Sequence, residues 1–212
     1  MLDEYKEEQK VVYKILKNSV IKNKYSHAYI FEKNNYKNAD KIVLAFVKYL
    51  LCHNNYSNNE LCGKCTQCNK IDKNIAIDVE IINPDGLWIK KEQLENLQMN
   101  FSKKSLENNK KIYIINEAEK LNTQAANSIL KFLEEPEENI IAILVTNNIY
   151  QLLDTIVSRC QIISLNKDNE LENINSIEKI SSILNNNNEN LEQIVTTVTN
   201  FIDYLEKNKT DT

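Results

Sequence analysis

The sequence has 212 residues, a net charge of −4, 42% hydrophobic residues and 26% charged residues, which are ordinary proportions for a globular protein. This length supports one good core, or one core with a small appended lobe. No apolar run approaches the roughly 20 residues that cross a bilayer, and the charged first residues lack the apolar centre of a signal peptide. We therefore expect a cytoplasmic protein without a membrane segment. A long basic nucleic-acid-binding stripe is also not visible.

The predicted elements alternate between helices and strands. Helical spacing over residues 4–22 precedes a short apolar strand at 27–31 and a second helix at 39–51. Beyond a cysteine-rich segment, the predicted strands are 78–82, 111–115, 140–146 and 162–165, and the predicted helices are 90–103 and 123–134. The strand at 140–146 is apolar without alternation, which indicates burial on both faces. Strands separated by helices predict an α/β fold, a parallel sheet with helices on both sides.

The last part of the chain has a different character. Beyond Asn166 the pattern turns helical and polar, and a run of asparagines at 185–188 is typical of a loop. We therefore predict an α/β domain over residues 1–165 and a small helical lobe over residues 166–212.

Four of the five cysteines fall within seventeen residues, with the spacing C-x9-C-x2-C-x2-C: Cys52, Cys62, Cys65 and Cys68. A cytosolic chain rarely holds such a cluster as disulfides, whereas four thiolates complete a tetrahedral zinc site and leave no open catalytic position. We predict a structural Zn²⁺ in a ribbon over residues 52–68, with the metal supplying folding energy. Unrelated reduced cysteines are the alternative, disfavoured because two consecutive C-x2-C steps seldom arise by chance.

The loop after the first predicted strand lacks groups that bind phosphate. A phosphate-binding loop needs glycines, a lysine and a hydroxyl, whereas residues 32–40 contain no glycine. Ala39 and Asp40 stand where the lysine and hydroxyl would fall, and Asp40 would repel phosphate; Lys33 and Asn38 belong to the same degenerate loop. This segment alone does not distinguish a lost nucleotide site from an ordinary strand–helix connection.

A second ATP-handling element is also incomplete. In P-loop ATPases an apolar strand at this place ends in two acidic residues, one for magnesium and one for the attacking water. Here the strand at 111–115 ends in Asn116, which carries no charge, and Glu117. Because both elements are impaired independently, we predict a chain without ATPase activity of its own.

Arg159 is the one arginine among 26 basic residues, and all the others are lysines. The excess of lysine and asparagine is what an AT-rich genome would produce, so the exception is informative. A planar guanidinium gives paired, directional hydrogen bonds to phosphate oxygens that lysine does not replace well. A surface or salt-bridged arginine is the ordinary alternative.

Four segments occur in order along the chain: SHAYIF at 26–31, the four-cysteine insert, NSILKFLEEP at 127–136, and TIVSRC at 155–160. In this series the chain resembles the AAA+ subunits of bacterial clamp loaders. The leucine-glutamate-glutamate-proline and serine-arginine-cysteine signatures are highly specific together. The resemblance covers about residues 5–165, and the tail only loosely. Because the phosphate loop is degraded, the resemblance is to the non-hydrolysing delta-prime type of subunit.

This resemblance implies an AAA+-type sheet domain with an inserted zinc ribbon and a partial helical lid. It implies that Arg159, with Ser158 of the same motif, acts in trans as an arginine finger on ATP in a neighbouring subunit, a group whose loss can cost ~10³–10⁵ in rate. It also implies gamma/tau ATPase and delta subunits as partners, within the DNA polymerase III holoenzyme. Family members usually continue into a helical collar domain, which we expect to be absent because the chain stops at Thr212.

The helix at 123–134 lies, in clamp loaders, near the chamber that admits primer–template DNA. Thr123 is predicted to cap it, which leaves backbone N–H groups able to meet a phosphate. Asn127 and Lys131 are further candidates for DNA contact. Solvated polar residues on an amphipathic helix are at least as good an interpretation.

Two rival functions stay open. An ATP-binding, gamma/tau-like clamp-loader subunit would bind ATP in isolation, which a binding measurement decides. A zinc-ribbon module for single-stranded nucleic acid would place aromatic residues around the cysteines, and only Tyr56 lies within the insert.

Overall fold

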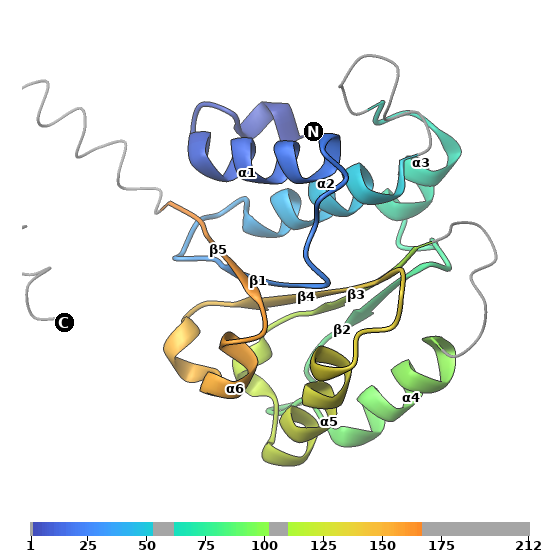
Figure 1. The fold of residues 1–212 in the computed structure, drawn as a ribbon, viewed down its shortest axis with the longest axis vertical. Helices are drawn as coiled ribbons and strands as arrows, with labels where there is room; N and C mark the ends of the chain where they lie inside the picture. The colour runs from blue at the N-terminus through green and yellow to red at the C-terminus, as the bar shows by residue number, and fades with distance from the viewer. Residues whose placement is uncertain (1, 53–61, 102–109, 167–212) are drawn as a thin grey trace, which may run out of the picture. The chain divides into compact units, whose positions relative to one another are not determined.

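The computed structural model describes residues 2–52, 62–101 and 110–166 (Figure 1). In these residues the chain forms a five-stranded sheet of order β2-β3-β4-β1-β5, in which every neighbouring pair is parallel. The strands are β1 (Ala28–Glu32), β2 (Val79–Ile82), β3 (Lys111–Ile115), β4 (Ile140–Thr146) and β5 (Gln161–Ser164). The predicted parallel sheet is confirmed.

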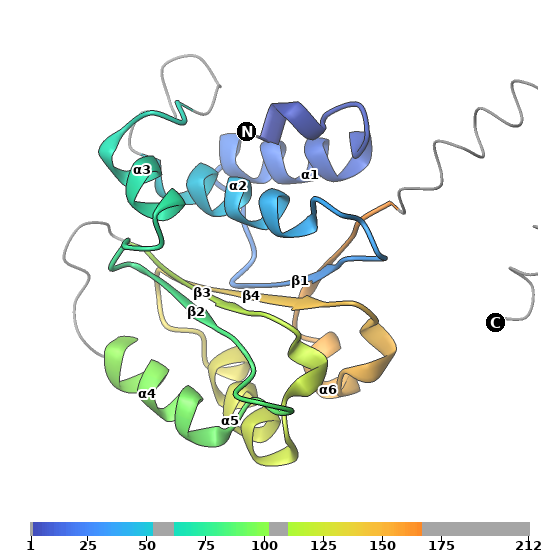
Figure 2. The ribbon, with the colours of Figure 1, turned by 180° about the vertical axis from the view of Figure 1, so that it is seen from behind.

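Helices cover both faces of this sheet, as Figures 1 and 2 show from opposite sides. One face carries α1 (Lys10–Ile21), α2 (Ala39–Leu51) and α3 (Thr66–Asp72), and the other carries α4 (Lys91–Phe101), α5 (Thr123–Glu134) and α6 (Asp154–Val157). Three short 3-10 segments complete the described elements: η1 (Leu2–Tyr5), η2 (Ala118–Lys120) and η3 (Ile149–Gln151). Among the described residues, no helix combines the length and apolarity that a membrane span requires.

The central strand β4 shows why its sequence is continuously apolar. Ile141, Ile143 and Val145 pack into the core under α1–α3. Ala142 and Leu144 point the opposite way, into the core under α4–α6. All five are at most 2% exposed, so the strand is buried on both faces as predicted.

The N-terminal segment differs from the single helix predicted over 4–22. It divides into η1 and α1, and the buried Gln9 lies at the junction. The Gln9 side chain bonds the backbone of Asn166 twice, donating to its carbonyl at 3.0 Å and accepting from its N–H at 2.9 Å. This long-range pairing, which no local pattern encodes, ties the start of the chain to the segment after β5.

One helix was not predicted: α3, whose seven residues are too few to show periodicity. The predicted helix 90–103 is observed as α4 (Lys91–Phe101), and residues 102 and 103 lie outside the described residues. Of the predicted lid lobe over 166–212, only Asn166 lies within the described residues, and Tyr56 of the insert also lies outside them.

Candidate functional site: a cysteine cluster and a single arginine

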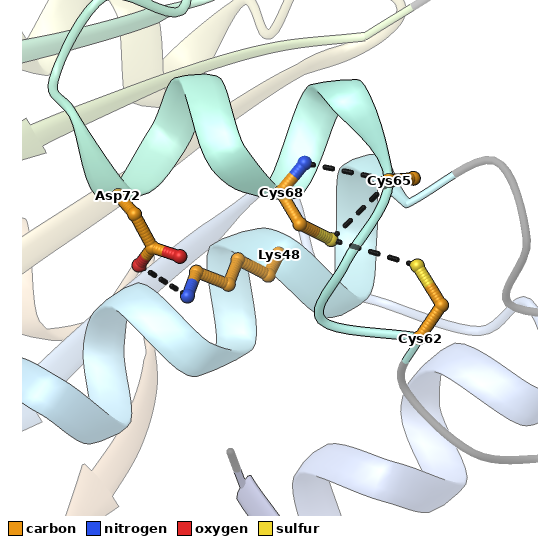
Figure 3. A network of polar contacts seen from close by, with 5 residues as sticks. All are labelled: Lys48, Cys62, Cys65, Cys68 and Asp72. Carbon is orange, nitrogen blue, oxygen red and sulfur yellow. Dashed lines mark hydrogen bonds and ion pairs between the residues drawn. The ribbon is translucent and has the colours of Figure 1, made fainter.

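The four cysteines predicted as ligands come together at the junction of α2 and α3. Cys52 follows the last residue of α2, and Cys65 is the N-cap of α3, where its sulfur accepts from the backbone N–H of Cys68 at 3.4 Å. Figure 3 shows the Cys62, Cys65 and Cys68 side chains converging beside α3. The helix start therefore fixes the C-x2-C pair on one turn.

The sulfur geometry fits a four-coordinate metal. The Sγ atoms all lie within 4.8 Å of one another. Cys52 lies 3.2 Å from Cys62 and 3.9 Å from Cys65, while Cys68 lies 3.4 Å from Cys65 and 3.9 Å from Cys62. A zinc tetrahedron with 2.3 Å zinc–sulfur bonds has edges of about 3.8 Å, so this cluster could hold such an ion. Cys160 is not part of it.

Electrostatics within the cluster favours an anion at one sulfur. Burial raises the pKa of the Cys62 thiol, but hydrogen bonds from the backbone at Lys64, from the Cys52 thiol and from Cys65 together lower it to about 6. Burial raises the pKa of the Cys68 thiol, and its neighbour Cys65 raises it further. A bound cation favours the ionised form of every ligating thiol. Four thiolates this close together would repel one another, and a bound metal cation would supply the positive charge that offsets this repulsion.

An ion pair joins α2 and α3, the two helices beside the cysteine cluster. Lys48 of α2 pairs with Asp72 of α3, and Figure 3 shows the two side chains meeting between these helices. Since Cys52 and Cys68 belong to the ends of the same two helices, the contact helps to hold the ligands in register.

The loop between β1 and α2 uses its polar groups internally. The ammonium of Lys33 lies 2.8 Å from the carboxylate of Asp40 in the first turn of α2. Asn34 and Asn35 adopt left-handed backbone conformations, with φ of 48° and 60°, which asparagine tolerates better than most residues. Asn38 is the N-cap of α2 but makes no capping hydrogen bond, and Ala39 is buried. The first turn of α2 thus carries an acidic side chain that is paired with Lys33.

Two further contacts anchor this loop. The side chain of Tyr36 is buried in the core under α1–α3, and its hydroxyl donates to the carboxylate of Glu8. Asn34 donates to the Leu165 carbonyl at 2.9 Å and to the Ser164 hydroxyl at 3.1 Å. The loop is thereby fastened to the N-terminal segment and to the chain after β5.

The ends of β2 and β3 meet through uncharged groups. Asn116, where a magnesium-binding acid would stand, donates its amide to the side chain of Asn83 at 2.8 Å. Glu117 has a left-handed backbone and pairs with Lys120 at 2.6 Å. The sequence indicated the missing charge at Asn116 but not its partner Asn83, because the pairing depends on strand order.

Arg159 lies outside the core, between α6 and β5. Ser158 is the C-cap of α6, and its hydroxyl donates to the Thr155 carbonyl at 3.2 Å. The guanidinium donates through Nη1 to the same carbonyl at 2.8 Å, and Nη2 lies 2.9 Å from a carboxylate oxygen of Glu134. The side chain is 35% exposed, so Arg159 is held in place yet open to solvent.

The Glu134–Arg159 pair joins the two sequence signatures that carried the resemblance, and sequence reasoning missed it. Glu134 is the last residue of α5, where a negative charge is opposed by the helix macrodipole unless a cation neutralises it. An acid at a helix C-terminus was therefore an available signal for a basic partner.

The three candidate DNA-contacting residues are Thr123, Asn127 and Lys131, and all are exposed along α5. Their spacing of four residues places them on one side of the helix. The predicted capping role of Thr123 is wrong: Asn122 is the N-cap, and its side-chain oxygen accepts from the N–H of Ala125 at 2.8 Å. Two adjacent residues with capping side chains cannot be ranked without the backbone geometry.

Comparisons with solved structures support the fold. A DNA polymerase III gamma-subunit-related protein from Thermotoga maritima aligns with a TM-score of 0.57 at 23% identity, covering 76% of this chain and 47% of that chain. At this identity the likeness concerns the fold alone, and it agrees with the AAA+-type arrangement.

Sequence relatives give the family. DNA polymerase III subunit delta-prime of Bacillus subtilis is 43% identical over 158 residues, and DNA polymerase III subunit gamma/tau of Mycoplasma genitalium is 31% identical over 182 residues. These matches cover 74% and 82% of this chain but only 47% and 30% of the relatives, so the chain spans less than half of their length. The family described as "DNA polymerase III, delta subunit" matches residues 8–169. The chain therefore belongs to this family of DNA polymerase III clamp-loader subunits, and its resemblance to the delta-prime type is confirmed.

Proposed function

We propose that this chain donates Arg159 to ATP bound in a neighbouring gamma/tau-type ATPase subunit and so supports loading of the clamp onto primed DNA. The observation that carries the proposal is the position of this arginine. It is the one arginine in 212 residues. It lies between α6 and β5, outside the core, and its side chain is 35% exposed. Serine and arginine at this place match the family's finger motif.

The chemistry suits the role. The guanidinium has five N–H donors, and its described contacts use acceptors on Thr155, Ser158 and Glu134. At least two N–H groups therefore have no acceptor among the described residues and can point at phosphate oxygens of a partner. Such a finger stabilises charge that develops on the transferred phosphoryl group. Ser158 acts indirectly, as the cap that ends α6 before the arginine.

We further propose that the chain hydrolyses no ATP itself. The Lys33–Asp40 pair removes the free ammonium and places a carboxylate at the start of α2. Asn116 bonds Asn83 and carries no charge for magnesium. The alternative function is an ATP-binding gamma/tau-like subunit, and the 31% identity to a gamma/tau protein supports it. Micromolar ATP affinity of the purified chain would favour that alternative.

The metal in the cysteine cluster is proposed to be structural Zn²⁺. All four sulfurs would be occupied, which leaves no position for substrate. The proposed setting is cytoplasmic, where thiols stay reduced. The proposal includes DNA contact through Thr123, Asn127 and Lys131, which is supported by their exposure on one side of α5.

The test is reconstitution with gamma/tau and delta subunits, comparing DNA-stimulated ATP hydrolysis for wild type and Arg159→Ala. Loss of a finger is expected to lower turnover at least about tenfold, since fingers are worth ~10³–10⁵ at the site they serve. Gel filtration shows whether the variant is in the complex. Unchanged turnover in a fully assembled complex would reject the finger.

A further inference from the structure

The guanidinium of Arg159 has three described acceptors, two at the end of α6 and one on α5, and the longest contact is from Nη1 to the Ser158 hydroxyl at 3.4 Å. Nη1 donates to the Thr155 carbonyl of α6 at 2.8 Å, and Nη2 pairs with Glu134 of α5 at 2.9 Å. Both contacts at the end of α6 are made by Nη1, so they leave the other terminal nitrogen of the guanidinium unfixed. The contact of that nitrogen, Nη2, with Glu134 fixes the plane of the guanidinium.

The position of Glu134 in its helix does not favour an acidic residue. As the last residue of α5 it places a negative charge at the negative end of the helix macrodipole. It is half exposed, at 49%, so its pair with Arg159 contributes little to stability. Glu134 therefore lowers the stability of α5, and its ion pair with Arg159 regains little of that stability. An effect of Glu134 on Arg159 explains its presence better.

We infer that Glu134 is a positioning residue for Arg159: its carboxylate orients the guanidinium so that the unpaired N–H groups face the nucleotide of the neighbouring subunit. The inference rests on the proposed finger function. A preformed orientation avoids the loss of side-chain freedom when the phosphate is met, and it places the donors before the reaction starts.

The experiment uses the reconstituted complex with gamma/tau and delta subunits, and measures kcat and KM for ATP in the presence of primed DNA. Glu134→Ala is expected to lower kcat by about threefold to thirtyfold with KM unchanged, because misorientation affects the transition state more than ground-state binding. Glu134→Gln retains an oxygen acceptor for Nη2 and is expected to stay within about threefold of wild type.

Two controls separate positioning from structure. Glu135→Ala removes the same charge one residue later, where no described ion pair reaches Arg159, and should leave kcat unchanged. The double variant Glu134→Ala/Arg159→Ala should be no slower than Arg159→Ala, because positioning has no effect without the finger. Thermal melting of each variant checks that the fold is retained.

The outcomes are distinct. A slow Arg159→Ala complex with a Glu134→Ala complex at wild-type rate would overturn the positioning role and leave the finger intact. A Glu134→Ala complex faster than wild type would overturn it as well, and would show that the carboxylate competes with phosphate. Wild-type turnover by Arg159→Ala would reject the finger and, with it, this inference.

Discussion

The two faces of the sheet differ in how they use their charged and polar groups. Under α1–α3, the cysteines converge on one another, Lys33 pairs with Asp40, and Tyr36 bonds Glu8. Under α4–α6, Arg159 keeps N–H groups without described acceptors at the protein surface. On the first face these groups contact one another within the chain. On the second face, Arg159 keeps N–H donors that another molecule could accept from.

This difference bears on the proposed function. The loop between β1 and α2 is fastened by its own side chains, while Arg159, the proposed finger, keeps N–H groups at the surface. Changes on the α1–α3 face should therefore alter stability but not turnover of the assembled complex, and changes at Arg159 should do the reverse. The following predictions test that division, from the largest effect to the smallest.

Loss of the metal should have the largest effect on stability. Cys65→Ser is expected to remove about one equivalent of zinc per chain and to lower the melting temperature by at least about 5 °C, since metal binding contributes folding energy. Metal analysis and calorimetry measure both. Cys160→Ala, outside the cluster, is the matched control and should retain the metal. A stable, metal-free wild-type protein would contradict the structural role.

Tyr36→Phe should cost less, about 1 kcal/mol in the free energy of unfolding, because it removes one hydrogen bond to a solvent-exposed carboxylate. Tyr150→Phe, at an exposed site, should cost nothing measurable. Denaturant titration gives both values. A Tyr36→Phe protein as stable as wild type would show that the loop is not anchored there.

The same hydroxyl predicts a pH dependence. Burial, and then the Glu8 carboxylate, raise the pKa of Tyr36 above its ordinary value. The unfolded chain therefore releases this proton at lower pH than the folded chain, and wild-type stability falls as pH rises above about 10. Above this pH, we expect the free energies of unfolding of wild type and Tyr36→Phe to become more similar. A constant difference between the two free energies from pH 8 to 11 would contradict a raised pKa of Tyr36.

Asp40→Asn should lower the free energy of unfolding by about 0.5 kcal/mol or less. The Asp40 side chain, which pairs with Lys33, is 67% exposed, and exposed ion pairs contribute little to stability. It should not restore ATP binding, since the loop still lacks glycines and Asn116 still lacks a charge. Equilibrium binding of a fluorescent ATP analogue tests this. Micromolar affinity in the variant would show that one carboxylate alone had closed the site.

The smallest effect is expected at Lys131. Lys131→Ala should reduce the slope of log affinity for primed DNA against log salt by about 1 if the ammonium meets a phosphate. Lys41→Ala makes the same change on α2, on the opposite face, where the residue is also exposed, and should leave the slope unchanged. Equal slopes for both variants would remove Lys131 from the DNA contact.

Much of the fold followed from local patterns. The unbroken apolar run of β4 predicted a strand buried on both faces, and cysteine spacing predicted which four sulfurs converge. These two predictions succeeded because each depends on residues that are close in sequence: the alternating sides of one strand, and cysteines at the two ends of neighbouring helices. The helix α3 escaped prediction because seven residues are too few to show periodicity, and because its start is capped by Cys65 rather than by a typical capping residue.

Long-range pairings could not be predicted. Arg159 with Glu134, Asn116 with Asn83, and Gln9 with Asn166 each depend on which elements lie side by side. Sheet order decides this, and sequence periodicity does not specify sheet order. The choice between Asn122 and Thr123 as the cap failed for a different reason, since both side chains can accept the bond and only backbone geometry selects one.

The most direct test compares Arg159→Lys with wild type in single-turnover ATP hydrolysis by the reconstituted complex. Lysine keeps the positive charge but loses the planar pair of donors. We predict that Arg159→Lys loses most of the rate, at least about tenfold, while assembly and melting temperature stay at wild-type values. A lysine variant that hydrolyses ATP at the wild-type rate would contradict the account, because any positive charge at that position would then suffice.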